Sequence, residues 1–169
     1  MKFKKNFLYI LLFFFYLTSY SYSLEKVAFI DLDYVVKNSN LGSEVLKKIE
    51  GLNKKNLTNL NEKQEELKKI EFEIKKKQNI VSSDEINKEI QLLKNKINKY
   101  NDEKNLLVSQ YNEFKNSELD KLMKIINPII QDYMKENSIE ILFDRKNIYI
   151  GDVNSDLTKI IIKKLNNLN

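Results

Sequence analysis

The feature that most constrains this chain is a pair of long amphipathic helical segments separated by one short turn. In the first segment, residues 43–79, a set of apolar side chains recurs on a seven-residue register that polar Asn53 interrupts: Leu46, Leu60, Leu67, Ile74 and, just beyond, Val81. Lysine and glutamate fill many of the positions between them. A thin apolar seam of this spacing is typical of a helix that packs against another helix rather than inside a globular core.

The second segment follows a predicted turn at residues 81–84. Ser82 is followed three residues later by Glu85, the capping-box pattern that begins a new helix. Apolar residues then recur at alternating steps of four and three, with Lys104 as the polar interruption: Ile86, Ile90, Leu93, Ile97, Tyr100, Leu107, Tyr111 and Phe114. Two such segments in succession predict an antiparallel helical hairpin.

The base of the hairpin is predicted near Pro128. After Phe114 the apolar register slips by one residue, a stutter that locally unwinds a supercoil. Pro128 removes a backbone donor and predicts a kink, for which a static bend is favoured over a functional hinge. Each arm has roughly 35 to 50 residues, and the shorter would extend about 55 Å at 1.5 Å per residue. The remaining residues cannot cover that length, so the hairpin should protrude.

The sequence before the hairpin predicts a short strand. Residues 27–32 form an apolar run with β-branched and aromatic side chains, which indicates a buried strand. A helical turn at 33–38 and a break at 40–42 should follow.

The sequence after the hairpin predicts two more strands and a helix. The strands are residues 139–143 and 147–150, joined by a hairpin loop at 144–146. The closing helix covers 157–168, with Ser155 or Asp156 as its cap. Three short strands and one or two helices bury too little apolar surface to be stable alone, so sheet edges should pair between subunits.

The composition excludes most catalytic chemistries. The chain of 169 residues has no cysteine, histidine or tryptophan, and its three glycines stand apart. Thiol chemistry, Cys/His metal sites, imidazole catalysis and glycine-rich phosphate loops are therefore absent. We expect no enzyme activity, no cofactor and no metal. Asp31, Asp33 and Asp144 could in principle hold Mg²⁺, but turn and cap roles are favoured.

Residues 1–23 predict a secretory signal peptide. Three lysines precede an apolar run at 7–17, and Ser21 and Ser23 have the spacing that a signal peptidase accepts. An uncleaved anchor is the alternative, although the run is short for a membrane span. Cleavage would reduce the net charge from +5 to +2, with 26 basic and 24 acidic residues remaining. So small a charge argues against nucleic-acid binding.

Both ends of the predicted mature chain resemble the Skp/OmpH family of periplasmic chaperones. The start is KVAFIDLDYVVKNSNLGSEVLKKIE, and the end is IEILFDRKNIYIGDVNSDLTKIIIKKLN. The elements recur in the family's order, after an export signal. The resemblance implies a periplasmic homotrimer whose three bodies form a central barrel. Its three helical hairpins would hold unfolded outer-membrane proteins in a cavity, without ATP.

The expected fold is therefore α+β and mainly α, with a long antiparallel helical hairpin projecting from a small β-rich trimerisation body. The expected divisions are a signal peptide at 1–23, a body strand and short helix at 24–41, the hairpin at 42–137, and body strands with a C-terminal helix at 138–169. The body residues expected to support oligomerisation are Val27, Phe29, Ile30, Ile141, Phe143, Ile148 and Ile150.

The tip of the hairpin is the candidate client-binding surface. Residues 68–99 contain nine lysines and five acidic residues, which favours contact with acidic clients, anionic lipid or lipopolysaccharide. A solvated lysine-rich helix surface is the alternative. Phe72 and Ile80 do not fit the apolar register and should be exposed there. The candidates are Lys68, Lys69, Phe72, Lys75, Lys76, Lys77, Ile80 and Lys88.

Two functions remain open on the sequence alone. An ATP-independent holdase agrees best with the signal peptide, the protruding hairpin and the family resemblance. The alternative is an exported structural or tethering coiled-coil protein of the cell envelope, which would use the apolar seam for a fixed partner.

Overall fold

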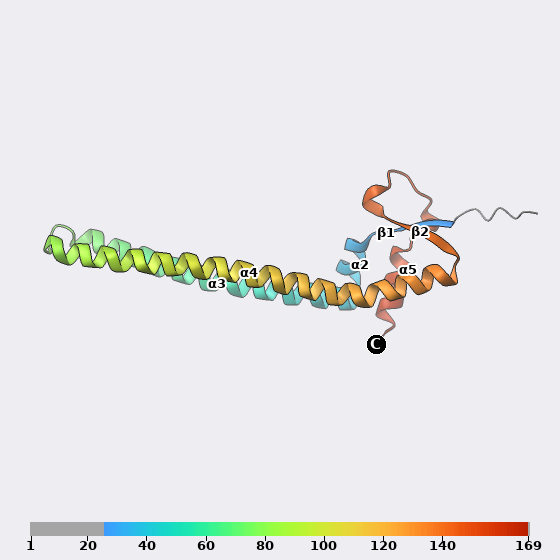
Figure 1. Ribbon diagram of the computed structural model, residues 1–169, viewed down its shortest axis with the longest axis horizontal. Helices are drawn as coiled ribbons and strands as arrows, with labels where there is room; N and C mark the ends of the chain where they lie inside the picture. The colour runs from blue at the N-terminus through green and yellow to red at the C-terminus, as the bar shows by residue number, and fades with distance from the viewer. Residues whose placement is uncertain (1–25, 169) are drawn as a thin grey trace, which may run out of the picture.

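The computed structural model describes residues 26–168, so the predicted signal peptide lies outside the described residues. The fold is mainly α, with a long helical hairpin that projects from a small body (Figure 1), as the sequence predicted. In chain order the elements are β1 (Lys26–Ile30), α2 (Leu32–Asn38), α3 (Asn40–Lys77), α4 (Ser83–Glu136), β2 (Ile139–Asp144), the 3-10 turns η1 (Arg145–Asn147) and η2 (Val153–Ser155), and α5 (Thr158–Asn166).

Helices α3 and α4 form the two arms of the hairpin. They contain 38 and 54 residues, which correspond to about 57 Å and about 81 Å of helix. The predicted cap is confirmed, because the Ser82 hydroxyl accepts a hydrogen bond from the Glu85 amide. The predicted break at 40–42 is wrong. Ser39 caps α3 directly by accepting from the Gly42 amide, so the helix begins at Asn40.

The contact between the arms is tight only at its two ends. Ile74 and Ile86 are buried near the tip, and Val45, Ile49 and Leu122 are buried near the base. Between these ends the apolar residues of the seam are only partly buried or exposed. Two ion pairs join the arms along this stretch, Lys63 with Glu103 and Lys96 with Glu66, and a third pair, Lys77 with Glu89, joins them at the tip. The middle of the hairpin is therefore held by a thin apolar seam and by ion pairs that remain open to solvent in part, each of which contributes little to stability.

Helix α4 continues through Pro128 without interruption and ends at Glu136. Pro128 is exposed, so its ring faces solvent. Because proline has no backbone N–H, the carbonyl four residues earlier loses one helical hydrogen bond. Leu122, Ile126 and Ile130 surround this position in the sequence and are buried in the body. The region around the stutter and Pro128 is thus the part of α4 that packs into the body.

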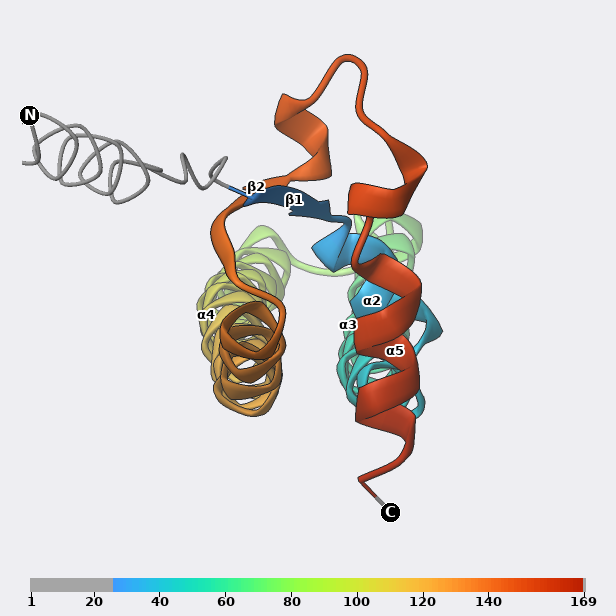
Figure 2. The same cartoon turned by 90° about the vertical axis from the view of Figure 1, so that its right-hand side faces the viewer.

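The body contains a parallel pair of strands, β1 and β2, which the whole hairpin connects. Val27 is paired with Ile141, and Phe29 with Phe143. One face of the pair contributes Ala28 and Ile30 to a core with α2, α4 and α5, in which Val35, Ile126 and Ile161 are fully buried. Figure 2 shows these helices on one side of the strands and residues 145–156 on the other.

The structure corrects the prediction of a third strand. Residues 147–150 form no strand, and residues 145–147 form a 3-10 turn instead of a hairpin loop. The Asp144 carboxylate accepts from the Lys146 amide, and the Ile148 amide donates to the Arg145 carbonyl, which turns the chain away from β2. The described part of the body therefore has two strands and is less β-rich than expected.

The closing helix is shorter than predicted. Helix α5 begins at Thr158, and Ser155 does not cap it. Asp156 is not the cap residue either: Leu157 occupies that position, and Asp156 accepts a hydrogen bond from the Thr158 amide at 2.9 Å just before the helix. The Leu157 amide donates to the Phe29 carbonyl, which joins the start of α5 to the edge of β1.

Candidate functional surfaces

The first candidate surface is the outer face of the two-stranded sheet. Val27, Ile141 and Phe143 lie on this face and are 42%, 39% and 44% exposed. The loop beside them is also apolar, with Tyr149 98% and Ile150 83% exposed. A hollow of about 650 Å³ lies between the strands and this loop. Exposed apolar side chains grouped around one hollow are typical of protein interaction surfaces.

The predicted body residues do not all belong to this surface. Val27, Ile141, Phe143 and Ile150 are exposed on it, whereas Ile148 is only partly exposed. Ile30 is 2% exposed and packs in the core of its own chain, so it cannot contact a partner directly. Tyr149 was not among the predicted body residues, although it lies directly between Ile148 and Ile150, which were.

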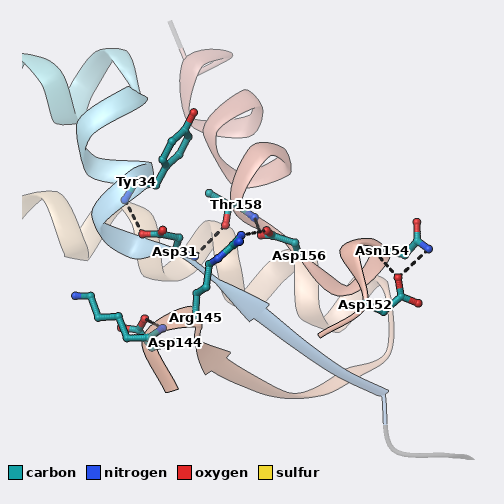
Figure 3. A network of polar contacts seen from close by, with 9 residues as sticks. Asp31, Tyr34, Asp144, Arg145, Asp152, Asn154, Asp156 and Thr158 are labelled. Atoms are coloured by element: carbon teal, nitrogen blue, oxygen red, sulfur yellow. Dashed lines mark hydrogen bonds and ion pairs between the residues drawn. The ribbon is translucent and has the colours of Figure 1, made fainter. Parts of the chain in front are cut away.

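The exposed loop is anchored at Phe29. Phe29 is 8% exposed, and a side chain added at Gly151 would meet its ring at 2.7 Å, so Gly151 permits the loop to approach closely. The Arg145 guanidinium lies 5.8 Å from the centre of the same ring. Arg145 also donates to Asp156 at 2.7 Å (Figure 3). These contacts hold the apolar loop beside the sheet.

The carboxylates considered for Mg²⁺ have structural roles. Asp31 caps α2 by accepting from the Tyr34 amide at 2.8 Å, and Asp144 caps the following turn (Figure 3). Asp33 pairs with Lys146 at 2.8 Å, and this hydrogen bond lowers the pKa of the Asp33 carboxyl. Within residues 26–168, no group of three or more acidic side chains is arranged to hold a metal ion.

The second candidate surface is the tip of the hairpin. Phe72 is 57% and Ile80 is 85% exposed, which agrees with their predicted exclusion from the seam. The Lys76 ammonium lies 4.4 Å from the centre of the Phe72 ring, a cation–π contact. The tip thus presents apolar side chains next to positive charge.

Many of the predicted tip lysines are already paired with glutamates. The pairs are Lys68 with Glu65, Lys75 with Glu71, Lys76 with Glu73, and Lys77 with Glu89. Hydrogen bonding to their partners raises the pKa of Lys68 and Lys77 and lowers the pKa of Glu65 and Glu71. Lys69 and Lys88 have no ion pair among residues 26–168. The positive charge available to a partner is therefore smaller than the lysine count suggests.

Several exposed apolar residues along the arms escaped the sequence analysis. Leu57, Leu92, Leu106 and Val108 are between 51% and 63% exposed. Because these residues lie outside the seven-residue apolar register, the sequence could have predicted their exposure. No helix within residues 26–168 combines the length and apolar character needed to cross a bilayer.

Comparisons with known proteins agree with this architecture. No curated protein sequence matches the chain. Among solved structures, the chain is similar to a protein from Caulobacter crescentus CB15 that is described as an outer membrane chaperone (OmpH-like). The TM-score is 0.74, the sequence identity is 16%, and 86% of each chain is covered. The profile of the family described as "Outer membrane protein (OmpH-like)" matches residues 26–165. The chain therefore belongs to the OmpH-like family.

Proposed function

We propose that this protein is an ATP-independent chaperone of the periplasm that holds unfolded outer-membrane proteins between helical arms and prevents their aggregation. Two observations support a chaperone role: the chain belongs to the OmpH-like family, and the similar solved structure is described as an OmpH-like outer membrane chaperone. The predicted signal peptide supports export. The proposed mechanism is non-enzymatic and uses no cofactor.

The observation that carries the proposal is a protruding hairpin on a body that cannot cover its own sheet. The long arms offer a large surface to a client, while Val27, Ile141 and Phe143 leave an apolar face open. Burying this face between copies would place several hairpins around one central body. We propose a homotrimer, in which the hairpins enclose a client-sized space.

The proposed contacts with clients are numerous and individually weak. Exposed Phe72 and Ile80 offer apolar contact at the tip, and Lys69 and Lys88, which have no ion pair within residues 26–168, offer attraction to acidic segments. The charge contacts are screened by salt, and weak contacts of either kind exchange rapidly, which suits a protein that must release its client without ATP. The same tip chemistry also supports contact with anionic lipid or lipopolysaccharide.

The experiment is an aggregation assay with the form that begins at residue 24. An outer-membrane β-barrel protein is unfolded in denaturant and then diluted into buffer. We expect the chaperone to suppress its aggregation at one proposed trimer per client molecule. A variant with Phe143→Ser and Ile150→Ser should lose both self-association, measured by sedimentation velocity, and suppression. Ile160→Ser, which changes an apolar residue outside the sheet face, is the matched control. Failure of a folded, self-associated wild-type protein to suppress aggregation would refute the proposal.

A further inference from the structure

A shallow groove runs along one flank of the hairpin, between α3 and α4. It consists of two neighbouring hollows of about 400 and 280 Å³, which share Lys96 as a lining residue. Its apolar lining comes from both arms: Leu67, Ile70 and Ile74 on α3, and Leu92, Leu93 and Tyr100 on α4. Leu92 is 63% exposed, so part of this lining is open to a partner.

The charges around the groove are unevenly satisfied. Each of its four carboxylates pairs with a lysine: Glu66 with Lys96, Glu73 with Lys76, Glu89 with Lys77, and Glu103 with Lys63. Lys69 on α3 and Lys99 on α4 also line the groove, and neither has an ion pair among residues 26–168. The charges left free on the two rims are therefore positive.

A further unpaired lysine lies next to the groove. Lys88 lines an adjoining hollow that shares Leu92 with the groove, and the part of the chain that the structure describes offers it no carboxylate within ion-pair distance. An occupant that carries negative charge would complement all three lysines, whereas a cationic occupant would find the carboxylates already engaged.

The length of the groove limits the kind of occupant. It extends from the Lys63–Glu103 pair to the Lys77–Glu89 pair, a separation of about 21 Å along the helix. An extended peptide that rises about 3.3 Å per residue would cover this length with about six or seven residues. Because side chains alternate along an extended strand, one side of it could contact the apolar lining and the other could carry charge.

We propose that this groove binds an extended polypeptide segment in which apolar residues alternate with aspartate or glutamate. Its apolar side chains contact Leu92 and the lining beside it, and its carboxylates pair with Lys69 and Lys99 on the two rims. Strands of membrane β-barrels have such alternation of apolar and polar residues. The inference rests on the proposed chaperone function and assigns its client contact to one flank of each arm.

The direct test measures binding of a fluorescein-labelled peptide of seven alternating leucine and aspartate residues by fluorescence anisotropy. We expect saturable binding that weakens as salt is added. The Lys69→Gln/Lys99→Gln double variant and Leu92→Ser should each raise the Kd about fivefold or more. The matched controls are Lys94→Gln and Leu106→Ser, which change an exposed lysine and an exposed leucine outside the groove and should bind as wild type.

Three results would overturn the inference. One is wild-type affinity in the groove variants, with helix content by circular dichroism unchanged. The second is that the groove variants lose binding to phosphatidylglycerol vesicles but still bind the peptide, which would make an anionic lipid the occupant. The third is that folded wild-type protein does not bind the peptide at all.

The aggregation assay separates this inference from the proposed function. If wild-type protein suppresses client aggregation and the groove variants bind the peptide normally, the groove assignment fails and the chaperone function stands. If wild-type protein does not suppress aggregation but binds the peptide through Lys69, Lys99 and Leu92, the chaperone function fails and the groove assignment stands.

Discussion

Gly42 and Gly51 lie in the same helix, yet alanine should have opposite effects at the two positions. A Cβ atom added at Gly42 would lie 2.1 Å from the Val36 carbonyl oxygen and 2.8 Å from the Ser39 hydroxyl. At Gly51 nothing lies within 4 Å of the added atom. The two substitutions therefore add the same methyl group to one helix, once against the end of α2 and once into open space.

The expected magnitudes follow from these contacts. Alanine in an open helix position gains up to about 1 kcal/mol over glycine, so Gly51→Ala should stabilise the protein by roughly that amount. At Gly42 the same gain is opposed by a clash with backbone that two helices hold in place. Overpacking of this kind costs about 1–3 kcal/mol, and a contact so far below van der Waals distance should make the net effect destabilising.

The measurement is urea unfolding followed by circular dichroism, on the form that begins at residue 24. All variants must be compared at one protein concentration, because the proposed self-association would make stability depend on it. Gly42→Ala should unfold at lower urea than wild type, and Gly51→Ala at higher urea. A Gly42→Ala variant as stable as Gly51→Ala would refute the close approach of α2 to the first turn of α3.

Three further outcomes are expected. Ile126→Ala removes a fully buried side chain where α4 joins the body and should cost about 2–5 kcal/mol by urea unfolding; a cost below that range would contradict its place in the core. Glu103→Gln breaks a partly buried pair with Lys63 and should cost about 1 kcal/mol, with faster hydrogen exchange only in the arms. Glu65 and Glu71 have a pKa lowered from 4.5, so their contribution is present above that pH and is lost as pH falls through the folded value; replacing both with Gln should flatten the acid end of a helix-content titration, and an unchanged titration would contradict it.

The hairpin was predictable because its determinants are local. A seam that recurs every seven residues and a capping serine at Ser82 act over one or two helical turns, and they specified two arms and the turn between them. The same locality explains why Phe72 and Ile80 could be identified as exposed, since neither fits the seam.

The body was less predictable because its chain depends on distant contacts. Residues 147–150 have the composition of a strand but form none, since Asp144 and Arg145 turn the chain away from β2. Likewise Gly42 suggested a break in the sequence, yet it lies in the first turn of α3. Glycine is needed at this position because the end of α2 leaves no room for a side chain.

The sequence by itself determined the helical arms, their seam, the family resemblance and the lack of cysteine and histidine chemistry, because each is a property of residue type and spacing. Only the tertiary structure decided which lysines remain free, since that depends on glutamates from the opposite arm as well as on the same helix. It likewise decided that Val27, Ile141 and Phe143 form one open face, because a parallel pair joins strands more than a hundred residues apart.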